Sequence, residues 1–338
     1  MGSVLTTCRG SSYWSCCDDR SAVLSNVDGN GKEPLSLPVG GLSITCFAAS
    51  FSGYNKMNKP NQDRVLVHYD KNTKSLIIGV FDGHGRKGHL VSQFIRDKFL
   101  KYLLQVDIFQ VDPLSSMHFA IKKAEEELVK TLTDVCSGSG TTVIVCILRG
   151  HKLYAINIGD SRLFIALRTE NQLIAENITK IHCPDHDVEK KRIEQNGGRI
   201  RSTRAFNSYQ SISRVFGEDG NLGGLAMSRS VGDTVLHRYG VISEPDLYER
   251  DLGDDTVGLL IGSDGLTTCF GMSKCFQVIL SEKSPKVGLK RLMSNCYRSM
   301  YQETNHTYVD DISGVFVQIH PVDLRKVKLE IIDRIPHM

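Results

Sequence analysis

Three apolar runs rich in β-branched residues follow one another between residues 141 and 168 with almost no chain between them. The runs at 141–148, 152–158 and 162–167 are separated only by the segments 149–151 and 159–161. A crossover between parallel strands needs about a dozen residues or more, so each run is expected to pair antiparallel with the next. This spacing predicts antiparallel sheet in this part of the chain.

Further elements complete the expected fold. Apolar residues recur at helical spacing over 90–105 and 113–135, which predicts two helices. The combination predicts an α+β fold class, with stacked antiparallel sheets and helices packed outside them, over a domain at 41–322. A short surface extension is expected at 323–338. Additional strands are expected at "LSITCFAAS", "RVLVHY", "SLIIGVF", "TVGLLIGSDG" and "SGVFVQI".

The composition and charge argue against a nucleic-acid partner and against a membrane-spanning helix. The 41 Lys and Arg residues nearly balance the 38 Asp and Glu residues, and the net charge of +3 is too small to indicate a nucleic-acid partner. No stretch approaches the roughly 20 apolar residues that a membrane-spanning helix needs. Ten cysteines occur without a CxxC pair, which is typical of reduced thiols in a cytosolic protein.

The N-terminal segment 1–40 carries a pattern for attachment to a membrane surface. It begins Met-Gly and has Thr6 at the favoured position for N-myristoylation of Gly2. One myristoyl chain binds membranes only marginally, with K on the order of 10⁴ M⁻¹, so a second anchor is needed. We expect a flexible leader and linker that holds the protein on the cytosolic face of a membrane; the alternative is an unmodified leader. The cysteines available for palmitoylation are Cys8, Cys16 and Cys17.

Two other segments are similar to ligand-binding motifs, but each lacks residues that such a motif needs, so we expect structural roles for both. The segment "IHCPDHD" contains His182, Cys183 and His186, yet no second ligand pair follows at zinc-site spacing. We therefore expect a surface turn before a helix. The run "SGSGTT" at 137–142 is similar to a phosphate-binding loop but lacks its lysine, so we expect it to start a core strand.

Four acidic residues lie where the chain enters or leaves a predicted strand: Asp63, Asp82, Asp264 and Asp310. Each alone is typical of a turn or cap. If the strand ends converge, four negative charges would repel one another unless cations neutralise them. Carboxylate oxygens favour Mg²⁺ or Mn²⁺, and two such ions about 3.5–4 Å apart can activate a water towards a phosphoryl group. His84 would then be placed to protonate a departing alkoxide.

Short motifs occur in a fixed order from about residue 42 to 319. They are "NQD" at 61–63, "VFDGHG" at 80–85, "SGSGTT" at 137–142, "NIGDSR" at 157–162, "DHDVEKKRIEQNGGRI" at 185–200, "LAMSRSVGD" at 225–233, "SEPDL" at 243–247, "IGSDGL" at 261–266 and "DDIS" at 310–313. This set resembles the metal-dependent serine/threonine protein phosphatases of type 2C, the PPM family. The resemblance implies a four-layer α-β-β-α sandwich with two central antiparallel sheets, and hydrolysis of phosphoserine and phosphothreonine on proteins.

The resemblance also implies a two-metal centre. Asp82 would bridge two Mn²⁺ or Mg²⁺ ions, and the Gly83 carbonyl would bind one of them. Asp264 and Asp310 would hold the other ion. Asp160 would contribute to a third, looser ion.

The remaining roles follow in the same way. Asp63 would orient metal-bound waters, His84 would act as general acid, and a water bridging the metals would be the nucleophile without a covalent phosphoenzyme. The alternative is a catalytically silent adaptor that keeps the fold to bind phosphoproteins, but the intact acidic set favours the enzyme. We expect a monomer.

The chain departs from the family pattern at two positions. Asn58 stands where many members carry an arginine that grips the phosphate; Lys56 or Lys59 would replace it with a point charge. Thr268 stands where members often carry an acid for the third ion. We expect weaker phosphate binding, with the chemistry largely retained.

The segment 201–224 between two of the motifs is long. In the family this region forms a flap beside the active site that influences substrate choice. Arg201, Arg204 and Arg214 are candidates to contact an acidic or phosphorylated substrate. The alternative is a solvated loop with scattered charge.

Overall fold

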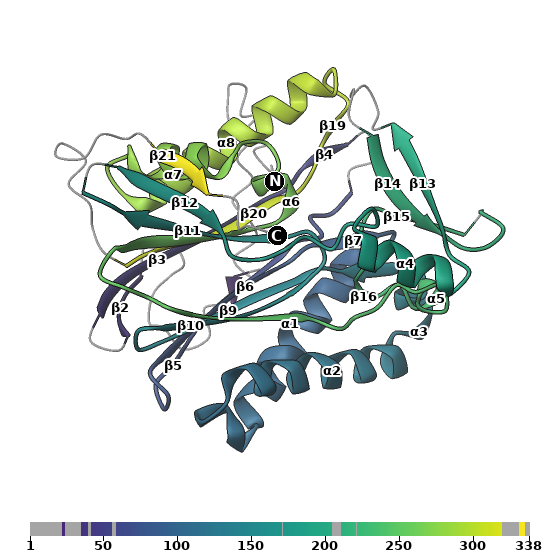
Figure 1. The fold of residues 1–338 in the computed structure, drawn as a ribbon, viewed down its shortest axis with the longest axis horizontal. Coiled ribbons are helices and arrows are strands. Elements are labelled where there is room, and N and C mark those ends of the chain that lie inside the picture. The colour runs from purple at the N-terminus through teal and green to yellow at the C-terminus, as the bar shows by residue number, and fades with distance from the viewer. Residues whose placement is uncertain are drawn as a thin grey trace, which may run out of the picture.

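Two large sheets form the centre of the molecule (Figure 1). This computed structural model describes residues 22–23, 35–39, 42–55, 59–170, 172–204, 211–220, 222–319 and 331–334. The first sheet has the order β1 (Ala22–Val23), β5 (Arg64–Asp70), β6 (Ser75–Phe81), β9 (Val143–Arg149), β10 (Lys152–Ile158) and β17 (Asp246–Asp251). The second has the order β2 (Leu35–Val39), β3 (Leu42–Phe51), β20 (Ile312–Gln318), β18 (Thr256–Gly262), β11 (Arg162–Arg168), β12 (Leu173–Asn177) and β21 (Ile331–Arg334).

The strands pair antiparallel throughout both sheets except at two edges. β1 pairs parallel with β5, and β21 pairs parallel with β12. The predicted α+β fold with antiparallel sheets is therefore confirmed.

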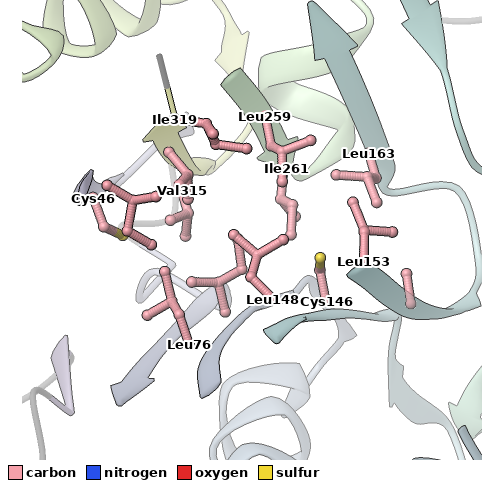
Figure 2. Packing of buried hydrophobic residues seen from close by; sticks show 14 of the residues in the cluster. Cys46, Leu76, Cys146, Leu148, Leu153, Leu163, Leu259, Ile261, Val315 and Ile319 are labelled. Carbon is pink, nitrogen blue, oxygen red and sulfur yellow. The ribbon is translucent and has the colours of Figure 1, made fainter. Parts of the chain in front are cut away.

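Apolar side chains pack in layers between the sheets and helices. One cluster joins the facing sides of the two sheets; Figure 2 shows members such as Leu76 and Cys146 from the first sheet opposite Ile261 and Val315 from the second. A second cluster lies between the first sheet and α1 (Gly88–Gln105) and α2 (Pro113–Thr131). A third lies between the second sheet and α7 (Met272–Leu280) and α8 (Pro285–Glu303). The helix pairs thus cover opposite outer faces (Figure 1).

Local sequence explains where these helices begin and which face they bury. Val91, Ile95 and Phe99 recur every four residues on α1 and are fully buried, which is the pattern of an amphipathic helix. The Asp112 side chain accepts a hydrogen bond from the Ser115 N–H at the start of α2. Such a cap satisfies one of the free N–H groups at a helix start.

One predicted strand pairing is wrong. β9 and β10 pair as expected, but β10 and β11 lie in different sheets, where β10 pairs with β17 and β11 pairs with β18. Gly159 has a φ of +103°, a left-handed conformation that favours glycine, just where the chain leaves one sheet for the other. A short connection excludes a parallel crossover, but it does not require the two strands to share a sheet.

Strands also occur outside the predicted domain of 41–322. β2 lies in the predicted linker, where Leu37 and Val39 are buried against the cluster between the sheets. β21 lies in the predicted C-terminal extension and adds an edge strand to the second sheet. These short segments supply apolar or main-chain partners to a sheet edge, which a linker composition does not reveal.

Three small sheets and several short helices complete the described part of the chain. The small sheets are β16 (Val231–Gly232) with β8 (Ser139–Thr141) and β7 (Gly83–Gly85); β13 (Arg199–Arg204) with β14 (Ser211–Phe216) and β15 (Gly223–Leu225); and β4 (Tyr54–Asn55) with β19 (Tyr308–Val309). The short helices are η1 (Asp107–Gln110), α3 (Thr133–Cys136), α4 (Asp187–Gln195), α5 (Thr234–His237) and α6 (Asp264–Thr267). The run "SGSGTT" starts a strand, as predicted.

The predicted surface turn at "IHCPDHD" is wrong for His182. This side chain is buried; its Nδ1 accepts a hydrogen bond of 2.9 Å from the Gly159 N–H, and its Nε2 lies 3.3 Å from an Asp246 oxygen. Each cysteine in the described residues is a free thiol. Over the same part of the chain, no helix combines the length and apolar character needed to cross a bilayer.

Candidate active site

Five aspartates line one pocket of about 360 Å³, and four of them lie in connections at the ends of strands of the two large sheets. Asp82 follows β6, Asp160 follows β10, Asp264 begins α6 just after β18, and Asp310 precedes β20. These strands come from both central sheets, so the sandwich gathers the ends of strands that are distant in sequence. Three of the four predicted strand-end acids therefore meet in the pocket.

The fourth predicted acid, Asp63, is buried and is not among the residues that line the pocket. It is 2% exposed, and its N–H donates to the side chain of Asn61. Burial and the nearby Asp311 carboxylate raise the pKa of Asp63 to about 7. Its position fits a role behind the pocket-lining acids, without direct contact with substrate.

The pocket concentrates negative charge. Burial raises the pKa of Asp82 well above its usual range, and the carboxylates of Asp63, Asp264 and Asp310 raise it further. The pKa of Asp264 is raised well above its usual range for the same reasons, and its strongest charged neighbours are Asp310 and Asp160. Groups that suppress one another's ionisation in this way are typical of sites that bind cations.

The donors present fit a hard divalent cation in their chemistry. Both carboxylate oxygens of Asp63 and Oδ1 of Asp160 are buried without a hydrogen-bond partner in the structure, and buried oxygens of this kind need a donor, a water or an ion. Mg²⁺ and Mn²⁺ prefer such oxygen ligands. Across the described residues, no three His, Cys, Asp or Glu side chains are placed closely enough to enclose one ion by themselves. The fit therefore rests on donor type and charge.

Backbone packing explains why glycine follows Asp82. A Cβ on Gly83 would lie 2.6 Å from the carbonyl oxygens of both Gln62 and Gly88. Thr142 makes two hydrogen bonds to the main chain of Asp82. Its Oγ1 accepts from the Asp82 N–H, and its own N–H donates to the Asp82 carbonyl. The "SGSGTT" motif thus anchors the main chain of the site.

His84 lies in the same pocket and pairs with an acid that the sequence pattern left without a role. Its Nε2 is 2.5 Å from Oδ2 of Asp233, the last residue of "LAMSRSVGD". The Ser230 hydroxyl donates to the same Asp233 oxygen at 2.8 Å. Burial by itself lowers the pKa of His84, but the Asp233 carboxylate outweighs it and the net pKa lies above the usual value. The Asp233 carboxylate therefore stabilises the protonated form of the ring.

A small sheet brings these two residues together. In it, Gly140 of β8 lies opposite His84 of β7 on one side and Gly232 of β16 on the other. Asp233 follows directly, and its N–H donates to the Ser139 carbonyl. Because 149 residues separate His84 from Asp233, only this pairing reveals their contact.

Two basic side chains line the pocket. They are Lys59, a predicted phosphate ligand, and Arg214, whose Nη1 donates to the Gly224 carbonyl at 2.7 Å. Arg201 instead packs over the Phe216 ring at 5.4 Å and is exposed. Lys56, Asn58 and the Arg204 side chain lie outside the described residues.

Thr268 replaces the expected third-site acid without contributing a charge. Its hydroxyl donates to the Asp264 carbonyl at 2.6 Å, at the end of α6. Asp160 remains in the pocket. The lipidation candidates Gly2, Cys8, Cys16 and Cys17 lie outside the described residues.

Comparisons with known proteins agree with this arrangement. The model of the family described as protein phosphatase 2C matches residues 47–304. The chain is 27% identical over 345 residues to probable protein phosphatase 2C 35 of Arabidopsis thaliana, covering 94% of this chain and 98% of that relative. It is 28% identical over 293 residues to probable protein phosphatase 2C 72 of the same plant, covering 82% of this chain and 86% of that relative.

A solved structure shares the fold. The serine-threonine phosphatase 2C from Toxoplasma gondii superposes with a TM-score of 0.70 at 20% identity, covering 85% of this chain and 99% of that one. The family match spans most of the chain, from within β3 to just past the end of α8. The chain therefore belongs to the protein phosphatase 2C family and is a serine/threonine protein phosphatase.

Proposed function

We propose that this phosphatase hydrolyses phosphoserine and phosphothreonine by attack of an activated water, with His84 as the general acid. The observation that carries the proposal is the meeting of Asp82, Asp264 and Asp310 with His84 in one pocket. Two Mn²⁺ or Mg²⁺ ions held there would supply an activated water and neutralise charge on the phosphoryl group. A third, weaker ion would bind at Asp160.

The protein's own groups then divide the work. The carboxylates and the Gly83 carbonyl would hold the cations, and Asp63 would orient water from behind them. His84 protonates the serine or threonine oxygen as it leaves, a contribution of about 10²–10⁴-fold for a general acid. Lys59 and Arg214 are the basic side chains of the described residues that line the pocket, so we assign them to the phosphate or to acidic groups beside it.

The test is phosphate release from a phosphothreonine peptide by purified protein, with Mn²⁺ or with a chelator. We expect release only with the metal, and none from Asp82→Asn, which loses one ligand charge at nearly constant size. Circular dichroism should show both proteins folded. A folded wild type that binds the peptide but releases no phosphate with metal would instead identify the adaptor.

We also propose that the leader anchors the enzyme on the cytosolic face of a membrane through myristate on Gly2 and palmitate on Cys8, Cys16 or Cys17. The support is the N-terminal sequence pattern. Gly2→Ala should move the full-length protein from the membrane to the soluble fraction. Gly10→Ala, a matched change in the same leader, should leave fractionation unchanged; equal behaviour of the two would refute the anchor.

For the catalytic protein in solution we propose a monomer. Sedimentation velocity should give a single species near the chain mass of 37.6 kDa. A species of twice that mass would contradict it.

A further inference from the structure

We infer that Asp233 is a positioning residue: it holds the His84 ring by Nε2 and leaves Nδ1 as the nitrogen that gives its proton to the leaving oxygen. The inference rests on the proposed function, because it concerns the group that acts as general acid there. It adds a residue and a specific ring nitrogen to that reaction.

The contacts distinguish the two nitrogens of the ring. Nε2 lies 2.5 Å from Asp233 Oδ2 and 3.2 Å from the Ser230 hydroxyl, so its hydrogen-bonding capacity is used within the protein. Nδ1 is buried and has no partner in the structure. A nitrogen already bonded to a carboxylate cannot also protonate a substrate, which leaves Nδ1 for that role.

The Asp233 carboxylate is itself fixed. Its side chain is 7% exposed, and the Ser230 hydroxyl donates to the oxygen that faces His84. Its backbone has a φ of +48° in the left-handed region, which is uncommon for a residue other than glycine and is seen more often for Asp and Asn. The Ser230 hydroxyl donates to the Asp233 side chain, and the Asp233 N–H donates to the Ser139 carbonyl. A buried acid held in this uncommon backbone conformation indicates that its side chain has a specific role at this position.

The chemistry balances with these groups alone. As the bond from phosphorus to the serine or threonine oxygen breaks, that oxygen keeps the electron pair and takes the proton from Nδ1. The ring becomes neutral and keeps its Nε2 proton, which stays hydrogen-bonded to the Asp233 carboxylate. Water adds its oxygen to phosphorus, and one of its protons restores the ring for the next cycle. Asp233 does not change its covalent state; it fixes which nitrogen faces the substrate.

The test compares two substrates that differ in their need for an acid. A phosphothreonine peptide releases a basic alkoxide, whereas p-nitrophenyl phosphate releases a stable phenolate that needs no proton. In Asp233→Asn, kcat for the peptide should fall about 100-fold with little change in KM, while p-nitrophenyl phosphate turnover should change less than about threefold. Asn keeps the size of the side chain and tolerates the left-handed backbone.

Three further measurements separate positioning from a structural role. Adding Asp233→Asn to His84→Ala should cause no further loss, because Asp233 acts only through the ring. Ser230→Ala should give the same selective loss at a smaller size, which covers the case in which Asp233→Asn does not fold. In nitrogen-15 spectra of the metal-free protein, the His84 Nε2 proton should appear at low field in the wild type and move upfield in Asp233→Asn.

The outcomes are distinct. Equal losses on both substrates, an additive double variant, or an unchanged His84 resonance would overturn the role of Asp233 and leave the phosphatase reaction standing. A wild type without metal-dependent release from either substrate would overturn the proposed function, and the inference with it.

Discussion

A methyl group added at Gly140 should disable the His84–Asp233 pair without touching any proposed metal ligand. The Cβ of Gly140→Ala would lie 2.2 Å from Asp233 Oδ2, 2.4 Å from Ser230 Oγ and 2.7 Å from His84 Nε2. Its backbone φ is not in the left-handed region, so the change introduces steric crowding without backbone strain. All three groups of the hydrogen-bonded cluster must move.

The size of the effect follows from these distances. To reach an ordinary contact of 3.4 Å, Asp233 Oδ2 must move by about 1.2 Å and His84 Nε2 by about 0.7 Å. Overpacking of this kind costs about 1–3 kcal/mol of stability. A misplacement of about 1 Å in a catalytic group can cost roughly 100-fold in rate. We therefore expect a folded protein with kcat for a phosphothreonine peptide lowered about 100-fold.

Gly138 provides the matched control in the same segment. A Cβ at Gly138 has no heavy atom within 4 Å, and its φ is not left-handed. Gly138→Ala should therefore keep the wild-type free energy of unfolding, measured in urea, and most of the turnover. If Gly140→Ala matched Gly138→Ala in both stability and kcat, the crowding argument and the contact of His84 with Asp233 would be refuted.

Three other changes probe charge. In chelator near pH 7, the Tm of Asp82→Asn should lie above that of the wild type, because burial and neighbouring carboxylates raise the pKa of Asp82 and so make its charge destabilising. Added Mn²⁺ should raise the Tm of the wild type more than the Tm of the variant. Glu189→Gln should lower the free energy of unfolding by about 2 kcal/mol, since it removes the buried carboxylate charge that pairs with the partly exposed Arg192 and Arg229, of which Arg229 keeps its ion pair with Asp246. Burial opposes ionisation of Glu189, but these arginines hold its pKa well below the usual range. The stabilisation from ionised Glu189 is therefore present above about pH 4.3 and is lost as the pH falls. In the variant, the free energy of unfolding should depend less on pH in this acidic range, as measured by circular dichroism. Lys59→Ala should raise KM for a phosphopeptide about tenfold with kcat retained, and an unchanged KM would remove Lys59 from phosphate binding.

The acidic residues of the site could be predicted from the sequence because the pattern that marks each of them lies within a few neighbouring residues. Asp82 and Asp264 each follow an apolar run and precede glycine, so both the strand and its exit can be seen within a few residues. The fold class followed from short connections for the same reason. The assignment of β10 and β11 to one sheet failed because connection length limits the direction of two strands but says nothing about which sheet each one joins.

Contacts between distant segments explain what the sequence did not reveal. His182 is buried because Gly159 and Asp246, each distant in sequence, supply its hydrogen bond and its charge. Asp233 reaches His84 only through the pairing of β8 with two other short strands. No spacing rule connects such residues, since their separation in the chain is set by everything folded between them.

The placement of charge in this fold has a physical reason. Strand interiors such as β6 and β18 are buried along their whole length and supply the apolar area that stabilises the sandwich. Carboxylates placed within those strands would be desolvated without partners, at a large cost. At the strand exits they lie in a pocket that solvent and ions can reach, while the rigid sheets prevent them from moving apart. Repulsion is therefore retained in the metal-free fold and released when cations bind, so metal affinity and metal-free stability should change in opposite directions when any one of these acids is neutralised.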